Sequence, residues 1–405
     1  MKNAIVIVVD RLGAGHIGPY GNTWIETVGF NRLAAQSMLV EFALTDSVDL
    51  ARVYRSYWQG IHAAKETDSG ATLPETIQPT AIQSVLITDS DVVPEMPGAD
   101  AFDERRILEP PLVEAAAADV NQTEMARLFA TAIDWLATSP PEPFLLWVHS
   151  RGMDGMWDAP TEYRQQFADE EDPEPPSFVS PPARRLDADF DPDELLGIQQ
   201  AYAGQVALVD LCLETLCESF AKLALAGRTL LTVTSPRGYP LGEHRCVGPV
   251  GPVLYEESTH VPWILRLPSG DGAAVRLGDL VQPPDLFATL RDWLELDEQL
   301  GRGWGSSLLP LAVSNQLGHR DRACTQTNDC TAFRTPAWSL HRHPGRPDEL
   351  FAKPDDRLEA NEVSSLCPEA VEQLLAAMAE FQTAAQTNGD TQLAPLSRLL
   401  AQGLD

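Results

Sequence analysis

The chain has 405 residues and an ordinary globular composition, with 44% hydrophobic and 22% charged residues. Its charge is unusual, because 59 acidic residues against 29 basic residues leave a net charge of −30. A field of that sign repels nucleic acid and anionic lipid, and no basic stripe offsets it locally, so we expect neither partner. No apolar run approaches the roughly 20 residues that cross a membrane, so we predict no membrane span.

The predicted elements alternate between strands and helices, which is typical of a parallel sheet with helices on both faces. Residues 4–9 read AIVIVV, a β-branched run typical of a strand buried on both faces, and this run ends at Asp10. Further strands are predicted at residues 84–88, 143–149, 229–234 and 260–267. Helices are predicted at residues 28–38, 114–137 and 195–225. The pattern favours the α/β class.

Composition divides the chain into two parts. We predict a large α/β domain over residues 1–310, interrupted at 165–193 by an acidic, proline-rich insertion that cannot bury much surface. Residues 311–405 are predicted to form a small α+β subdomain, with strand structure around 331–340 and a helix over 368–385.

The six cysteines form no Cys-x-x-Cys pair and adjoin no histidine cluster, which argues against a structural zinc site. Cys324 and Cys330 flank a short polar loop and could pair across it. The first apolar run is short and ends in a charge, unlike a secretory signal, so we expect a cytoplasmic protein.

Five motifs follow one another along the chain: AIVIVVDRLGAGHIGPYGN, the helix, strand and loop ending in TSPRGYPLGEH, LYEESTHVPWILRLP, QPPDLFATLRDWLEL, and the C-terminal RTPAWSLHRHPGRPDELFAKPDDRLEANEV. In this order they resemble the motifs of the sulfatase family of the alkaline phosphatase superfamily. The resemblance implies an α/β/α sandwich around a large, mostly parallel sheet, with a small C-terminal α+β subdomain. It also implies the hydrolysis of sulfuric esters.

The resemblance further implies a divalent cation, such as calcium, held mainly by carboxylates after the first strand and after a late strand. Asp10 is present as the first of these ligands, but the second falls on Arg11. The late pair falls on Pro236 and Arg237. We therefore interpret Asp10 as a remnant ligand, and we hypothesise that Arg237 or Arg11 replaces the metal as its counter-ion.

The family's nucleophile is a cysteine, oxidised to formylglycine, or a serine. Counting back from Gly60 places Leu50 at that position, and a shift of one residue brings Asp49 there. Neither residue is a cysteine or a serine. Other candidate cleft residues are His149, which ends an apolar strand, and His244, in the loop after the late strand.

We therefore predict a degenerate sulfatase homologue, a pseudoenzyme that needs no cofactor and acts by binding or assembly. Its partners would be a small anionic or sugar-type ligand in the cleft, a second copy of the chain, or an active paralogue. The alternative is an active sulfate or phosphate ester hydrolase with a rearranged site. That reading would require calcium or another divalent cation.

Overall fold

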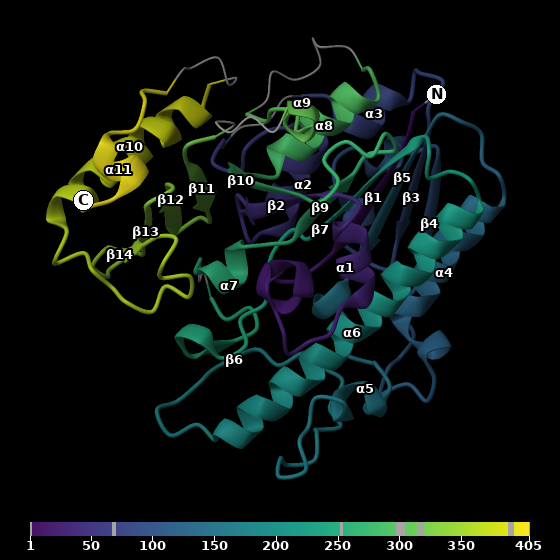
Figure 1. Cartoon of the computed structure of the whole chain (residues 1–405), viewed down its shortest axis with the longest axis horizontal. Coiled ribbons are helices and arrows are strands. Elements are labelled where there is room, and N and C mark those ends of the chain that lie inside the picture. Colours follow the sequence, from purple (N-terminus) through teal and green to yellow (C-terminus); the bar gives the residue numbers. More distant parts are fainter. Residues whose placement is uncertain are drawn as a thin grey trace.

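The computed structural model describes residues 2–66, 70–251, 254–296, 304–314, 320–387 and 393–404. Its centre is an eight-stranded sheet in the order β10-β2-β9-β7-β1-β5-β3-β4 (Figure 1). In chain order these strands are β1 Asn3–Val9, β2 Met38–Ala43, β3 Gln83–Thr88, β4 Glu104–Ile107, β5 Phe144–Ser150, β7 Thr229–Thr234, β9 Trp263–Arg266 and β10 Val275–Val281. Only β9 runs antiparallel to its neighbours within this sheet. The α/β class and the mostly parallel sheet predicted from the sequence are therefore confirmed.

Strand β1 lies in the middle of the sheet, paired with β5 on one side and β7 on the other. Its side chains alternate between two hydrophobic cores, as the pleat of a strand requires. Ile5, Ile7 and Val9 enter one core, and Ala4, Val6 and Val8 enter the other. Because both faces are covered, the apolar run is continuous rather than alternating.

Helices cover both faces of the sheet. The first core lies under α1 Val28–Ala34, α4 Glu124–Ala137 and α6 Pro192–Lys222, with α5 Thr161–Gln165 packed on α6. The second core lies under α2 Leu50–Gln59, α3 Leu73–Ile77, α8 Pro284–Trp293 and α9 Leu309–Ser314. A short helix, α7 Glu256–Thr259, precedes β9. This is the three-layer arrangement that the resemblance implies.

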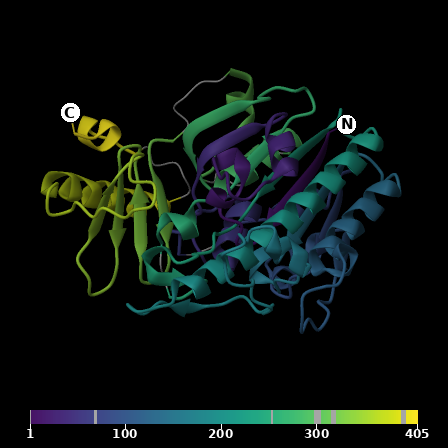
Figure 2. The same ribbon diagram turned by 60° about the horizontal axis from the view of Figure 1, so that its bottom comes forward.

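The C-terminal part forms a second, antiparallel sheet beside the first (Figures 1 and 2). Its strands are β11 Ala323–Gln326, β12 Thr331–Arg334, β13 Trp338–Arg342 and β14 Glu349–Ala352. The helices α10 Pro368–Ala385 and α11 Arg398–Gln402 pack on it through a separate hydrophobic cluster. A two-stranded ribbon, β6 Arg184–Arg185 with β8 Cys246–Val247, completes the sheets.

Several predicted boundaries were wrong. The helix expected over 28–38 ends at Ala34, because Met38 begins β2 and pairs with both β10 and β9. The helix expected over 114–137 begins only at Glu124, where the Thr123 side chain caps it. The strand expected over 260–267 is limited to β9.

The C-terminal details also needed correction. The strand expected around 331–340 is two strands, β12 and β13, joined by a turn in which Thr335 N donates to Trp338 O at 2.8 Å. Cys324 and Cys330 are free thiols that belong to different hydrophobic clusters. The helix predicted over 368–385 is present as α10.

The proline-rich stretch 165–193 is mostly exposed and is anchored by the buried side chains of Val179 and Leu186. It contains β6 and the first turn of α6. Within the described ranges, no helix combines the length and apolar character required to cross a membrane.

Candidate functional site at the end of the first strand

Asp10 follows β1 at the carboxyl end of the sheet, the edge where open α/β sheets bind ligands. Its residue is 1% exposed, and both carboxylate oxygens accept hydrogen bonds from one guanidinium. Arg237 donates from Nε to Oδ1 at 2.9 Å and from Nη2 to Oδ2 at 2.8 Å. Burial alone would raise the pKa of Asp10, but Arg237, helped by Arg11, brings that pKa below its ordinary value.

Arg237 comes from the loop after β7 and is itself nearly buried, with its side chain 12% exposed. Burial would lower its pKa, but the Asp10 carboxylate outweighs burial and raises that pKa. Its third nitrogen, Nη1, donates to the Val48 carbonyl at 3.1 Å. Arg237 therefore links the end of β1 to the segment that leads into α2.

Arg11 faces a different carboxylate. Its Nε lies 2.5 Å from Asp154 Oδ1, in the loop after β5, and its Nη1 donates to Gly238 O at 3.4 Å. The backbone of Arg11 is left-handed, with φ 60°, and its carbonyl accepts from the Tyr202 hydroxyl at 2.8 Å. Of the two arginines proposed from the sequence, the structure thus places Arg237, and not Arg11, in direct contact with Asp10.

The predicted nucleophile position lies at the start of α2. Leu50 is the first residue of that helix and offers no attacking atom. The exposed residue Asp49 is its N-cap, and its Oδ1 accepts from Ala51 N at 2.9 Å and Arg52 N at 3.2 Å. The Asp49 carboxylate therefore serves the helix terminus, while the contact between Val48 and Arg237 brings this terminus beside Asp10.

His149 is the next-to-last residue of β5 and is fully buried. Its Nδ1 lies 2.7 Å from the Tyr54 hydroxyl, and its Nε2 has no hydrogen-bond partner among the described residues. Burial lowers the pKa of His149 to about 4, although the nearby Asp10 charge opposes that effect. The imidazole is therefore neutral at physiological pH, and His149 lies in the electrostatic neighbourhood of Asp10.

His244 belongs to a separate cluster. Its Nδ1 lies 2.9 Å from Glu257 Oε1, its Nε2 lies 2.9 Å from Glu359 O, and its ring stacks on Tyr255 with centroids 3.6 Å apart. Burial would lower its pKa, but Glu257 dominates and raises it to about 9. Within the described ranges, no hydrogen bond or ion pair joins His244 to Asp10, and the contact with Glu359 ties the loop after β7 to the C-terminal part of the chain.

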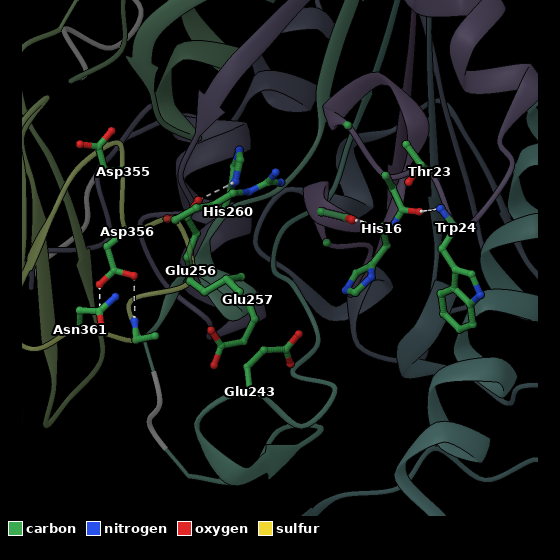
Figure 3. A pocket seen from close by; sticks show the side chains of 17 residues that line it. His16, Thr23, Trp24, Glu243, Glu256, Glu257, His260, Asp355, Asp356 and Asn361 are labelled. Atoms are coloured by element: carbon green, nitrogen blue, oxygen red, sulfur yellow. Dashed lines mark hydrogen bonds and ion pairs between the residues drawn. The ribbon is translucent and has the colours of Figure 1, made fainter. Parts of the chain in front are cut away.

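A cavity of about 760 Å³ opens beside the loop that follows β1 (Figure 3). Figure 3 shows His16 and Trp24 on one side and Glu257 and Asp356 on the other. Asp10, Arg237 and His149 are not among the residues that line it. The cavity beside the motif loop is thus lined by several carboxylates and does not include the Asp10 pair.

The residues around Asp10 do not fit the divalent cation that the resemblance implies. Both Asp10 oxygens are occupied by Arg237, and the adjacent ligand position carries Arg11. Hard cations require several oxygen ligands. Over the ranges that the structure describes, no three side chains of the types His, Cys, Asp and Glu group closely enough to hold a metal ion.

Some residues of this neighbourhood were not predicted from the sequence. Tyr54 contacts His149 across 95 positions, and Asp154 contacts Arg11 and lies 3.5 Å from Arg237. Asp46 is buried before α2, accepts from Ser56 and Ala63, and has its pKa raised to about 7 by burial. Each of these contacts joins positions that are separated in the sequence, so local patterns do not indicate them.

Comparison with known proteins places the chain in context. The family model described as Sulfatase matches residues 64–296, more than half of the chain. Arylsulfatase K of Rattus norvegicus is 31% identical over 173 residues, which cover 42% of this chain but only 28% of that relative.

Two solved structures share the fold. The phosphonate monoester hydrolase of Agrobacterium radiobacter aligns with a TM-score of 0.77 at 17% identity, covering 95% of this chain and 96% of that one. BT4656, solved with its substrate D-glucosamine-2-N,6-O-disulfate, gives 0.76 at 15% identity, covering 96% and 100%. With the family-model match, the ordered motifs and this architecture, the chain belongs to the sulfatase family.

Proposed function

We propose that this sulfatase-family chain does not hydrolyse sulfuric esters and acts instead by binding or assembly. One observation carries the proposal: the carboxylate at the family's first metal-ligand position is held by both of its oxygens in a buried ion pair with Arg237. The partners that fit this role are a small anionic or sugar-type ligand, a second copy of the chain, or an active paralogue.

The chemistry of sulfate transfer supports this reading. The reaction requires an in-line nucleophile, a group that draws charge from the sulfate oxygens, and an acid for the leaving alcohol. Leu50 has no nucleophilic atom, and Asp49 is exposed and bound to the backbone of α2. A cation at Asp10 would first have to displace two charge-assisted hydrogen bonds.

The positive charges near Asp10 would then repel a divalent cation. A divalent cation about 5 Å from a fixed guanidinium meets a repulsion of several kcal/mol at an effective dielectric of about 20. Arg237 and Arg11 both lie in this region, and both have carboxylate partners there. The set of charges is therefore already balanced without a metal ion.

The test is turnover of an aryl sulfate, an aryl phosphate and an aryl phosphonate monoester, each with calcium, magnesium, manganese or zinc. We expect rates equal to those of buffer. Turnover that persists through purification and is abolished by Asp10→Ala would overturn the proposal. Turnover that Asp10→Ala leaves unchanged would identify a contaminating hydrolase.

The alternative function, an active hydrolase with a rearranged site, is favoured by one observation. The buried His149 Nε2 has no partner among the described residues and lies near Asp10, as a general base awaiting a substrate would. Turnover that is lost in both Asp10→Ala and His149→Gln, with the fold retained, would select this alternative. Asp49 and His244 would then again be candidate residues of the active site.

A further inference from the structure

A second cavity, of about 680 Å³, lies where the β6–β8 ribbon meets the C-terminal sheet. Three arginines from separate segments line it: Arg185 in β6, Arg245 just before β8, and Arg346 in the turn between β13 and β14. All three residues are exposed. The volume falls within the range of roughly 300–1,000 Å³ that is usual for small-molecule sites.

These guanidinium groups are unpaired. None of the three forms a hydrogen bond or ion pair with any residue in the part of the chain that the structure describes. This is unexpected because acidic residues outnumber basic residues 59 to 29, and the neighbouring Arg184 does pair with Glu194. Three arginines without an ion-pair partner among the described residues thus line one cavity of a molecule whose net charge is −30.

The remaining charges of the lining do not cancel this excess. Asp329 is the one carboxylate that lines the cavity within the described ranges. His244 also lines it, but its charge is offset by Glu257. His343 also faces other side chains, because its Nδ1 lies 3.3 Å from Cys330 Sγ and its Nε2 lies 3.4 Å from Glu349 Oε2.

The same short segments separate this cavity from the acidic one. Glu243 faces the acidic cavity, whereas His244 and Arg245 face the basic one, and Glu257 and Tyr255 divide in the same way. Acidic and basic lining residues are therefore separated within a few positions of the chain. The basic character of the second cavity is a local feature, because the net charge makes the surface acidic on average.

We propose that this basic cavity binds a small molecule carrying two or more oxyanion groups, of the phosphate or sulfate ester type. Guanidinium presents a planar fork of donors that matches such oxygens two at a time, and three forks from three segments suit more than one anionic group. A long polyanion is disfavoured because the surrounding molecule repels it. The proposal concerns binding alone and stands whether or not ester hydrolysis has been lost.

The test is titration calorimetry at physiological salt and without divalent cations. Pyrophosphate and methanedisulfonate serve as paired phosphate and sulfur oxyanions, and inorganic phosphate and sulfate as single ones. We expect a paired anion to bind more tightly than its single counterpart. The comparison of the two paired probes tells which ester type the cavity prefers, and preference for either supports the proposal.

The variants make the result specific. The double variant Arg245→Ala/Arg346→Ala is expected to weaken binding of the paired anion by roughly tenfold or more. The matched control, Arg105→Ala/Arg127→Ala, removes two exposed arginines whose side chains also form no hydrogen bond or ion pair among the described residues, and should change affinity less than about twofold. All four side chains are exposed, so circular dichroism should show both variants folded. Equal weakening in the two variants, or binding of none of the four probes, would overturn the proposal.

Discussion

At the scale of single residues, the central feature of the candidate site is the buried ion pair between Asp10 and Arg237. A buried carboxylate without a counter-ion is costly, so a chain that retains Asp10 but lacks its companion ligands must supply a positive charge. Arg237 does so from the loop after β7, at a position where the resemblance predicts a metal ligand. The guanidinium thus supplies the charge that the buried carboxylate requires.

Arg237→Ala tests that dependence. Removing one partner leaves Asp10 buried and unpaired, so we expect the free energy of unfolding at neutral pH to fall by about 3–5 kcal/mol. Asp10→Asn in the same chain should recover part of the loss, because the amide carries no charge. Urea unfolding of the four members of this double-mutant cycle measures the coupling. Arg105→Ala is the exposed control, and a loss below about 1 kcal/mol in Arg237→Ala would contradict the prediction.

His244 predicts a pH dependence. Its pKa is raised from 6.5 to about 9, so its contribution to stability is fully present below pH 6.5 and is lost as pH rises through about 9. The full shift corresponds to about 3 kcal/mol, and solvent screening of this partly exposed pair reduces that figure. We expect wild type to lose more stability than His244→Gln between these two pH values. Equal pH profiles from denaturant unfolding of the two proteins would show that the ion pair with Glu257 contributes nothing.

At the scale of elements, α2 begins at Leu50, where the resemblance predicts the nucleophile, and its first turn is capped by Asp49. A capping carboxylate accepts from the free N–H groups of the first turn and complements the helix dipole. The Asp49 side chain therefore stabilises the start of α2.

Asp49→Ala should lower the free energy of unfolding by about 0.5–2 kcal/mol, as loss of an N-cap usually does, and Asp49→Ser should restore most of it. Thermal and urea unfolding measure both variants. If any hydrolase activity is found, a capping role predicts that it survives in Asp49→Ser. Loss of that activity in a folded Asp49→Ser protein would point to the alternative function.

The buried strands could be predicted from the sequence because their apolar runs reflect burial on both faces, as in β1, β3, β5 and β7. Strands β2, β4 and β10 were missed. Met38 continued the apolar spacing of the preceding helix, and only pairing with β10 and β9 assigns it to the sheet. Local periodicity cannot report such long-range pairing.

The site was predictable only where a motif supplied the register. Counting along the motifs led to the hypothesis that Arg237 or Arg11 is the counter-ion of Asp10, and Arg237 is the one whose guanidinium bonds to it. Tyr54 with His149, and Arg11 with Asp154, join distant segments through polar side chains that have no periodic signature. The three arginines of the basic cavity were not predicted either, because they come from three segments that are far apart in the sequence.

At the scale of the whole molecule, the net charge of −30 produces self-repulsion that salt screens. We expect the midpoint of thermal unfolding to rise as sodium chloride increases from about 0.02 M to about 0.5 M, since buried pairs such as Asp10 with Arg237 are screened much less. Differential scanning calorimetry measures it. A midpoint that falls over this range would show that surface ion pairs outweigh the repulsion.

The thin partition formed by residues 243–246 and 255–257 has a thermodynamic consequence. An anion bound in the basic cavity would raise the affinity of the acidic cavity for a positively charged molecule. By linkage, a cation bound in the acidic cavity would raise the affinity for the anion by the same factor. Two solutes of opposite charge would then bind with positive cooperativity, without any movement of the backbone. Such reciprocity would make the binding of each solute depend on whether the other is present.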